Sequence, residues 1–505
     1  MKFLHTRKEE GQMDGIIANL AGGFWNWVIL VGLIILVGNI ILSGLIVFFE
    51  RRNPSSTWAW LLVLLFIPVL GFLVYMVFGR NSRREKMFLK KEEYDRSIYH
   101  NDADAVRRNR EQKKMIRSKE QLIENEYVND LIHMHLNSGS WMTFNNEIDY
   151  YNNGKDKFDA LIEDIRNARK HIHLEYYIWR GDSLGKRLTE ELTKKAAEGV
   201  EVRVLYDGIG NSRLPKRFFA KLHEAGGYSA AFLPRLVVRL NYRNHRKLAI
   251  IDGEIGYIGG FNVGDEYLGI KKRYGSWRDT HLRFRGDAVE QMQLRFLKDW
   301  NFTSQKGKMT INDWYFPERE AFDGVPTQIV SSGPDTKWNN VRNGFFKMMN
   351  EAESHIYLTT PYFVPDDSIF EALRVAALAG IDVRIIIPGN PDHFFVYWAS
   401  MSYLGELLEA GVKVYQYEKG FIHAKVLTID GKVATVGSAN MDVRSFVLNF
   451  EVNAFMYDEK TAQLLEDEFQ NDLRYCVEIT KEWYHRRKWW FKVHEAVARL
   501  VSPML

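Results

Sequence analysis

Two long stretches near the N-terminus contain only apolar and neutral residues. Residues 24–48 and 57–79 carry no charged side chain, although Pro68 and Gly71 interrupt the second stretch. A helix of the first length reaches roughly 37 Å, more than the about 30 Å thickness of a bilayer core. Helices inside membranes tolerate proline and glycine breaks. The pattern predicts a transmembrane helical hairpin within residues 1–80.

Basic residues are distributed unevenly around these stretches. Only Arg51 and Arg52 lie between them, whereas the second stretch is followed by Arg80, Arg83, Arg84, Lys86, Lys90 and Lys91. Basic residues favour the cytoplasmic side. We therefore expect a multi-pass protein of the cell membrane, with the N-terminus and everything after residue 80 in the cytoplasm. A cleaved signal peptide is the alternative for the first stretch, but the apolar run is too long and no small-residue cleavage pattern follows.

Residues 81–140 are dense in charged and amide side chains, with scattered apolar positions. This pattern predicts a solvated, charged helical linker. The first dozen residues also suit an anionic lipid surface, where each basic residue contributes about 1 kcal/mol. The two interpretations are compatible.

After this linker the apolar pattern alternates between helix and strand, and it does so twice. Residues 158–178 have the spacing of an amphipathic helix that leads into a strand, and residues 345–362 repeat this order. Each is followed by a helical stretch, a glycine and a β-branched run. We expect an α/β fold of two similar halves, 141–320 and 321–480, each a sheet with helices on its faces.

A short motif, H-x-K-x4-D, occurs once in each half. The copies consist of His245, Lys247 and Asp252, and of His423, Lys425 and Asp430. Their flanks match at further offsets: Gly253, Gly259 and Asn262 after the first copy, and Gly431, Gly437 and Asn440 after the second. Matching residue types at so many equal offsets indicate two copies of one structural unit. We expect each to present a histidine, a lysine and an asparagine to a shared site.

The motif lies on apolar, β-prone runs, and a strand places alternate residues on one face. The histidine and the lysine of each copy should therefore point the same way. Asp252 and Asp430 lie an odd number of positions after their histidines, so they should face away. We count these aspartates in the catalytic motif but expect them to support it by anchoring the turn at the end of the strand.

Two histidines and two lysines without metal ligands suit attack on a phosphodiester. Lys247 and Lys425 can neutralise nonbridging oxygens, and Asn262 and Asn440 can donate hydrogen bonds to the same oxygens. One neutral imidazole attacks phosphorus to give a phosphohistidine, while the other, protonated, delivers its proton to the leaving alkoxide. Two histidines are needed because the nucleophile and the acid approach phosphorus from opposite sides.

Each histidine benefits from a partner that orients its other ring nitrogen. Asp279 and Glu451 follow the two motifs at similar distances and are our candidates for this orienting role. Each is also compatible with an ordinary surface acid.

Composition mainly excludes functions. A net charge of +4 over 505 residues is too small to indicate a nucleic-acid partner, and we expect none. The only cysteine, Cys476, cannot form an intrachain disulfide. There is neither a Cys/His cluster with zinc-ligand spacing nor a G-x4-G-K-[ST] nucleotide loop, so we expect no metal and no cofactor.

The doubled motif with its G-[GS]-x-N flank resembles the phospholipase D superfamily. The paired apolar stretches together with residues 50–54, 241–247 and 437–446 resemble the bacterial cardiolipin synthases of that superfamily, and the likeness covers nearly the whole chain. The resemblance implies two phospholipase D-like domains with pseudo-twofold symmetry and a site at their interface.

The same resemblance implies roles for the site residues. It makes His245 the nucleophile and His423 the acid and base, with the orienting carboxylates crossing over, so that Glu451 serves His245 and Asp279 serves His423. Pseudo-symmetry leaves either histidine geometrically eligible as the nucleophile.

The implied reaction is a reversible phosphatidyl transfer between two phosphatidylglycerol molecules, which gives cardiolipin and glycerol. The alternatives are a membrane-bound phospholipase D or nuclease, in which water resolves the phosphohistidine, and a catalytically idle scaffold.

Three further features of the sequence stay open. Residues 481–505 mix aromatic and basic side chains, as an interfacial helix on an anionic membrane does, but a helix packed on the catalytic core has the same composition. Residues 232–238 and 394–398 suit either the core or an entrance for acyl chains. The oligomeric state is not indicated.

Overall fold

The computed structural model describes residues 26–44, 54–67, 70–71, 75, 87–95, 126–233, 241–271, 273, 275–304, 307–318 and 324–502. The chain divides into two compact units, Met1–Arg84 and Glu85–Leu505.

The first unit contains a helix that is long and apolar enough to cross a membrane, Asn26–Gly44, at the first predicted stretch. A second helix, α2 (Pro54–Phe66), covers the start of the second predicted stretch, and most of the rest of that stretch lies outside the described residues. The two helices touch. The Asn39 side chain donates to Leu64 O at 3.3 Å, and Leu42 packs against the small apolar cluster around Leu64.

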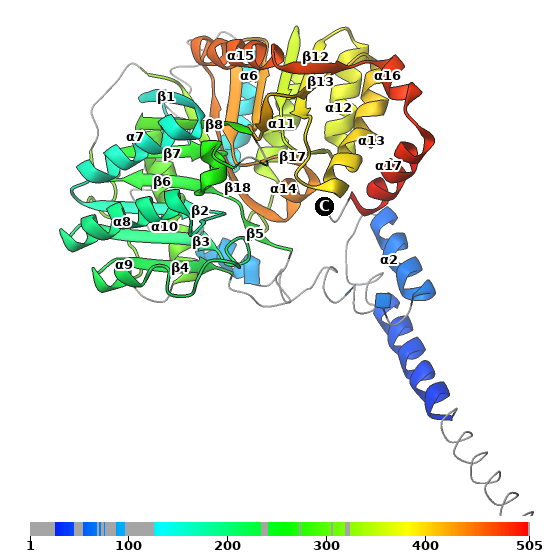
Figure 1. Cartoon of the computed structure of the whole chain (residues 1–505), viewed down its shortest axis with the longest axis horizontal. Coiled ribbons are helices and arrows are strands. Elements are labelled where there is room, and N and C mark those ends of the chain that lie inside the picture. Colours follow the sequence, from blue (N-terminus) through cyan, green and yellow to red (C-terminus); the bar gives the residue numbers. More distant parts are fainter. Residues whose placement is uncertain are drawn as a thin grey trace, which may run out of the picture. The chain divides into compact units, whose positions relative to one another are not determined.

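The first half of the second unit is a mixed sheet with helices around it (Figure 1). In spatial order its strands are β1 (Asn146–Asn153), β8 (Ser276–Gly286), β7 (Ile255–Gly259), β6 (Lys247–Ile251), β2 (His171–Tyr176), β3 (Glu201–Asp207) and β4 (Tyr228–Phe232). The helices are α7 (Gly154–Asn167), α8 (Ser183–Ala197), α9 (Ala220–Glu224), the 3-10 helix Asp265–Leu268 and α10 (Ala288–Thr303).

The second half has a sheet with the strand order β19 (Cys476–Ile479), β13 (Lys413–Tyr417), β12 (Asp382–Pro388), β10 (His355–Thr359), β15 (Val426–Ile429), β16 (Val433–Gly437), β18 (Asn449–Met456) and β5 (Arg243–Asn244). β9 (Thr327–Ser332) also pairs with β18, and β11 (Phe363–Val364) pairs with β17 (Met441–Asp442). The helices are α6 (Glu126–Asn137), α11 (Asn340–Glu351), α12 (Asp367–Leu378), α13 (Phe394–Ala410), α14 (Val443–Val447), α15 (Glu459–Leu473), α16 (Lys481–Arg486) and α17 (Trp489–Val501).

The two sheets repeat one topology. The order β8-β7-β6-β2-β3-β4 in the first half corresponds to β18-β16-β15-β10-β12-β13 in the second. In both, the first three pairings are antiparallel and the next two are parallel. The predicted α/β fold of two similar halves is confirmed.

Strand β6 shows why the motif lies on a continuous apolar run. Leu248 and Ile250 point to one face of the sheet, into a core that includes α10, while Ala249 and Ile251 point to the other face, under α7 and α8. The strand is therefore buried on both sides, as strands covered by helices on both faces are.

A shared apolar core joins the two halves. Ile258 and Phe284 from the first sheet and Val436 and Val452 from the second belong to one buried cluster. Because this cluster is continuous, the two halves of the second unit are packed as one body around their common interface.

The prediction that residues 81–140 are solvated is wrong for the two segments of this range that the structure describes. In the helix at 87–95, Phe88 is 1% exposed and packs with Tyr242 and Phe450. In α6, Leu131 and Ile132 lie in the core of the second half. The charged composition misled the prediction because the apolar positions between the charges are buried against distant parts of the chain.

The C-terminal helices α16 and α17 lie against α13 (Figure 1). Phe394 and Phe395 at the start of α13 are more than half exposed, so they are not core residues. Phe232, in contrast, is fully buried between the halves, and residues 234–238 lie outside the described part of the chain.

Candidate active site

Each motif histidine lies against a strand of the other half. β5 runs beside β18, and the His245 N–H continues that ladder by donating to Phe450 O at 3.0 Å. β14 (Gly420–Ile422) runs beside β8, and the His423 N–H donates to Arg278 O at 2.7 Å. Each histidine is thus held next to the residue that precedes a candidate carboxylate of the opposite half.

This crossing produces two histidine–carboxylate pairs. His245 Nδ1 lies 2.9 and 3.0 Å from the two carboxylate oxygens of Glu451. His423 Nδ1 lies 2.6 Å from Asp279 Oδ2. Both carboxylates are completely buried, and both histidines are nearly so. The Nε2 atom of each ring is left for chemistry, while Nδ1 is fixed by its carboxylate.

Two residues to which the sequence assigned no role hold Glu451. Ser438 Oγ donates to Glu451 Oε2 at 2.5 Å, and Asn449 Nδ2 donates to Oε1 at 3.1 Å. Burial raises the pKa of Glu451, but attraction to His245 and Lys247 and the serine hydrogen bond outweigh burial and lower it. Glu451 therefore stays ionised and can stabilise a positive charge on His245.

The equivalent of Ser438 in the first half is Gly260, the other residue allowed by the G-[GS]-x-N flank. A Cβ at Gly260 would lie 1.9 Å from Asp279 Oδ1. The Thr280 N–H, at 2.7 Å, donates to that oxygen instead. The variable position of the motif therefore marks a difference between the two carboxylates. Glu451 accepts a hydrogen bond from the Ser438 hydroxyl, whereas the Asp279 carboxylate occupies the space that a side chain at position 260 would need.

Both motif lysines are buried beside their histidines, as strand alternation predicts. The ammonium groups of Lys247 and Lys425 donate to the carbonyls of His245 and His423. Burial lowers the pKa of Lys247 to about 7 against the attraction of Glu451, and that of Lys425 to about 8 against the attraction of Asp279. An anionic phosphate between them favours their charged forms.

Burial also lowers the pKa of both histidines. The pKa of His245 falls to about 4, although Glu451 raises it. That of His423 falls because of burial and Lys425, against the attraction of Asp279. Both rings are therefore neutral near pH 7 before substrate binds, which is the form that a nucleophile needs.

The aspartates of the motif lie away from this chemistry. The Asp252 carboxylate accepts backbone N–H groups from residues 169–171, at 2.7 to 2.9 Å. Asp430 accepts the equivalent N–H groups of residues 353–355, at 2.8 to 2.9 Å. Both have φ 55°, the left-handed region found in tight turns. Their place in the catalytic motif is thus that of turn anchors.

The two asparagines are buried, and their phosphate-binding role stays a prediction. Asn262 Oδ1 accepts the Ile178 N–H at 3.0 Å, and its Nδ2 donates to Tyr267 Oη at 3.1 Å. The Asn440 N–H donates to Ser445 Oγ at 3.2 Å. These bonds fix the loops, and the Asn262 amide has a second N–H to offer.

Aromatic rings surround the histidines. Tyr177 lies 4.9 Å from His245 between ring centroids, while Trp277 and Tyr362 lie 5.3 and 6.5 Å from His423. Trp277 had a signal in the sequence, since it comes two residues before Asp279. Among the described residues, no three His, Cys, Asp or Glu side chains gather as a metal-ligating group.

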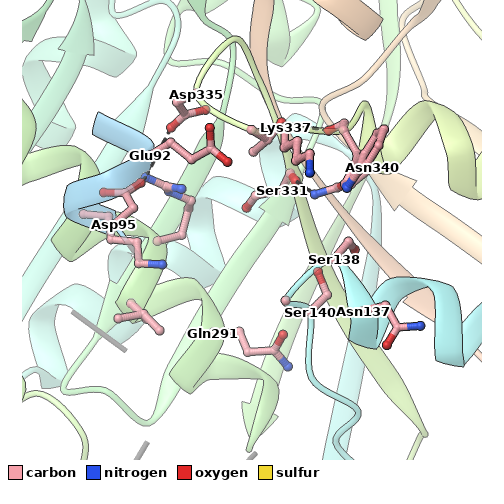
Figure 2. Close-up of a pocket in the computed structure, with 16 residues that line it drawn as sticks. Glu92, Asp95, Asn137, Ser138, Ser140, Gln291, Ser331, Asp335, Lys337 and Asn340 are labelled. Carbon is pink, nitrogen blue, oxygen red and sulfur yellow. Dashed lines mark hydrogen bonds and ion pairs between the residues drawn. The ribbon is translucent and has the colours of Figure 1, made fainter. Parts of the chain in front are cut away.

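A separate polar cavity of about 390 Å³ contains no residue of either motif. Figure 2 shows Glu92 and Asp95 on the helix at 87–95, facing residues of α6, α10 and the 331–340 segment across it. Behind the cavity, Lys91 lies 2.8 Å from Asp95, 3.3 Å from Asp299 and 2.5 Å from Asp335. These ion pairs fasten the helix at 87–95 to the catalytic unit.

The same network reaches the first motif. Arg246, between the motif histidine and lysine, points to the opposite face and pairs with Asp299 at 2.7 Å. Arg246 and Asp299 are fully buried. The pair holds the motif backbone from behind, so His245 and Lys247 present their side chains to the front.

The family model described as "Cardiolipin synthase, PLD-like domain" matches residues 161–300 and 345–473. A cardiolipin synthase of Listeria welshimeri is 50% identical over 467 residues, which covers 91% of this chain and 95% of the relative. The chain belongs to the cardiolipin synthase family. The major cardiolipin synthase of Bacillus subtilis is 49% identical over 470 residues, 91% of this chain and 96% of that protein.

Another family model and a solved structure also resemble this chain. The model described as "Phospholipase_D-nuclease N-terminal" matches residues 27–80. The crystal structure of a phosphatidylserine synthase from Haemophilus influenzae shares the fold, with a TM-score of 0.58 and 15% identity over 74% of this chain and all of that one. This likeness shows that the two proteins share a fold.

Proposed function

We propose that the chain is a cardiolipin synthase that transfers a phosphatidyl group from one phosphatidylglycerol to another, releasing glycerol. The observation that carries the proposal is the pair of crossed His–carboxylate contacts, each beside a buried lysine, in a chain of this family. This arrangement supplies a nucleophile, an acid and two cations to one phosphodiester without a cofactor.

In the first step, His245 Nε2 attacks the donor phosphorus and the P–O bond to glycerol breaks. Glu451 stabilises the imidazolium that forms, and Lys247 and Lys425 balance the charge on the nonbridging oxygens. Protonated His423 gives its proton to the departing glycerol oxygen. Substrate phosphate raises the pKa of His423 when it binds, which favours the protonated form at this stage.

In the second step, neutral His423 takes the proton of an acceptor hydroxyl. The acceptor oxygen bonds to phosphorus and the P–N bond to His245 breaks. One phosphodiester replaces another, so the transfer is close to reversible and needs no nucleotide. We assign the nucleophile to His245 because of the resemblance to the superfamily.

Purified protein incubated with phosphatidylglycerol tests the reaction. We expect cardiolipin and glycerol in equal amounts, and no product from His245→Ala or His423→Ala. Phosphatidic acid without cardiolipin would show that water, not a lipid, resolves the intermediate. Unchanged activity in both alanine variants would show that the site is idle.

Trapping with labelled phosphatidylglycerol tests the roles of the two histidines. We expect the label on His245. If glycerol can leave without the acid, more label should accumulate in His423→Ala, because resolution of the intermediate needs the base. Label on His423 reverses the assignment.

For the membrane, we propose a multi-pass hairpin with the catalytic unit in the cytoplasm. The contacting helices of the first unit and the basic residues after position 80 support this orientation. In a Cys476→Ser background, we expect an impermeant thiol reagent added to intact cells to label Ser56→Cys and not Asn101→Cys. The reverse pattern would place the catalytic unit outside.

The C-terminal helix offers a surface for the bilayer. α17 turns Glu495 inward to Tyr484 and Arg487, and exposes an apolar stripe made of Trp489, Trp490, Val493, Val497 and Leu500. A helix that faces water reverses this arrangement. Exposed Lys488 and Lys492 flank the stripe, as suits anionic headgroups.

This stripe is connected to the active site. Tyr362 lies 6.5 Å from His423 and 6.1 Å from His393, which immediately precedes exposed Phe394. Phe394 lies 5.6 Å from His494 on α17. We propose that the stripe and the start of α13 rest in the headgroup region, so that lipids reach His423 from that side.

A further inference from the structure

Two arginines, one from each half, lie beside the nucleophile. Arg243 is on β5, two residues before His245, and the ladder with β18 continues through His245. Alternate residues of an extended segment share a face. Arg243 therefore lies on the same side of the segment as the His245 ring.

Arg444 reaches the same place from α14. Its Nη2 donates to Asn241 O at 3.2 Å, and Arg243 Nη1 donates to Tyr242 O at 3.0 Å. Both side chains thus fold over residues 241–243, and both are partly exposed. Burial lowers the pKa of Arg444, and Arg243 lowers it further, as expected for two cations held close together.

Tyr177 connects these arginines to the reaction centre. Its ring is 4.9 Å from that of His245, and the Lys247 ammonium lies 5.4 Å from its centroid. Burial and the charge of Asp207 raise the pKa of the Tyr177 hydroxyl, while the charges of Arg243 and Arg444 and a hydrogen bond from Arg243 oppose that rise. Tyr177 therefore links the two arginines to the His245 ring, which attacks phosphorus in the proposed reaction.

The nearby carboxylates accept backbone N–H groups, and their charges also attract Arg444. Asp207 accepts the N–H groups of Ile209, Gly210 and Asn244 at 2.7 to 2.9 Å. Asp442 caps α14 by accepting the Ser445 N–H at 2.6 Å. The cluster therefore combines two guanidinium groups with two acids that already serve as turn and helix caps.

We propose that Arg243 and Arg444 bind the phosphate of the acceptor lipid, an inference that rests on the proposed function. Lys247 and Lys425 serve the donor phosphate, so the second phosphate of the reaction needs its own cations. Guanidinium groups bind phosphate oxygens in a bidentate manner. A three-carbon glycerol unit separates that phosphate from the attacking hydroxyl, which reaches the phosphohistidine while the phosphate stays at the arginines.

This site explains why a lipid hydroxyl competes with water. A hydroxyl held in line has an effective concentration far above that of free molecules, on the order of 10⁵ M or more in well-oriented systems. In the transfer, the hydroxyl proton goes to His423, the oxygen bonds to phosphorus, and the bond to His245 Nε2 breaks. Anchoring the phosphate positions the acceptor without changing the chemistry.

Two reactions of the full-length protein separate this role from a structural one. Condensation of two phosphatidylglycerols uses an acceptor phosphate, whereas exchange of labelled glycerol into phosphatidylglycerol uses an acceptor without one. For Arg243→Gln and Arg444→Gln, we expect the ratio of condensation to exchange to fall about 10- to 100-fold, the range for a lost charge-assisted hydrogen bond. Lysine at either position should restore part of the ratio.

Arg342→Gln is the matched control. Arg342 is also partly buried, and it pairs with Asp366 at 2.8 Å in the second half. We expect its ratio to equal that of the unmodified protein. A parallel loss of both reactions in the Arg243 and Arg444 variants, or an unchanged ratio, overturns the proposal. Phosphatidic acid in place of cardiolipin from the unmodified protein would instead overturn the proposed function.

Discussion

The two histidines differ in how their carboxylates are supported, although their motifs are identical. Glu451 accepts hydrogen bonds from Ser438 and Asn449 in addition to His245, whereas Asp279 accepts the Thr280 N–H. The two halves therefore supply the same motif residues, but the surroundings of these residues differ. We propose that this asymmetry allows two equal rings to take unequal roles.

Ser438→Gly tests the support of Glu451. A hydrogen bond to a charged group contributes about 1.5–3 kcal/mol, so we expect kcat for condensation to fall about 10- to 100-fold. Ser354→Gly, at an exposed position, should leave kcat unchanged. Gly260→Ser should abolish activity, because its Cβ would meet Asp279. A Ser438→Gly protein with normal kcat excludes the supporting role.

Anion binding should depend on pH through the motif lysines. Lysine is charged below its pKa, and burial lowers the pKa of Lys247 to about 7 and that of Lys425 to about 8. We expect tungstate to bind most tightly near about pH 6 and to lose about tenfold in affinity for each lysine that becomes neutral as the pH rises. Calorimetric titration measures this, and an affinity that stays constant to about pH 9 contradicts it.

Lys247→Met serves as the control for this titration. The Lys247→Met protein should bind tungstate weakly at about pH 6, and the change in tungstate affinity near pH 7 should be absent.

The sequence predicted the residues that the structure brings together in the candidate site, because repetition and strand alternation both constrain them. It did not reveal Ser438, Asn449 or Tyr177 as partners. Each is an ordinary strand or loop residue until the other half places a carboxylate or an imidazole beside it. The G-[GS]-x-N flank contained the serine, but only the structure shows what its hydroxyl contacts.

At the level of elements, the helix at 87–95 shows the limits of local composition. Its charges predicted solvation, and Lys91 was among the basic residues expected near the membrane. Lys91 is instead fully buried among Asp95, Asp299 and Asp335. Asp95 is four residues along the same helix, but Asp299 comes from α10 and Asp335 from the segment after β9, which no local pattern can indicate.

Lys91→Met should destabilise the full-length protein. Removing one member of a buried ion-pair network leaves uncompensated charge and costs about 3–5 kcal/mol. Denaturant unfolding of the detergent-solubilised protein measures the change. Lys90→Met, at an exposed neighbouring position, should stay within about 0.5 kcal/mol of the unmodified protein. Equal stabilities for the two variants would show that the network does not fasten the helix.

At the level of the whole molecule, repetition allowed the doubled sheet to be predicted, because two copies of a buried motif require two copies of its surroundings. The direction of α17 was not predictable. Its apolar stripe has the spacing of a core-facing helix, and only the packing of Glu495 against Tyr484 and Arg487 shows that the stripe points outward.

Trp489→Ser and Trp490→Ser test the proposed bilayer contact. We expect lower activity on phosphatidylglycerol in vesicles and normal activity on a short-chain, soluble phosphatidylglycerol, because the chemistry is intact and only access changes. Trp338→Ser, exposed on the loop before α11, should alter neither activity. Equal losses on both substrates would assign these tryptophans to folding instead.

The exchange of strands between the halves has a genetic consequence. Because Asp279 contacts His423 and Glu451 contacts His245, we expect a lesion at either carboxylate to disable the histidine of the other half. In complementation tests, we therefore expect defective alleles to group by histidine–carboxylate pair and not by the half of the gene in which they lie. Neither half, expressed by itself, contains a complete histidine–carboxylate pair, so we expect a truncated gene product to be inactive.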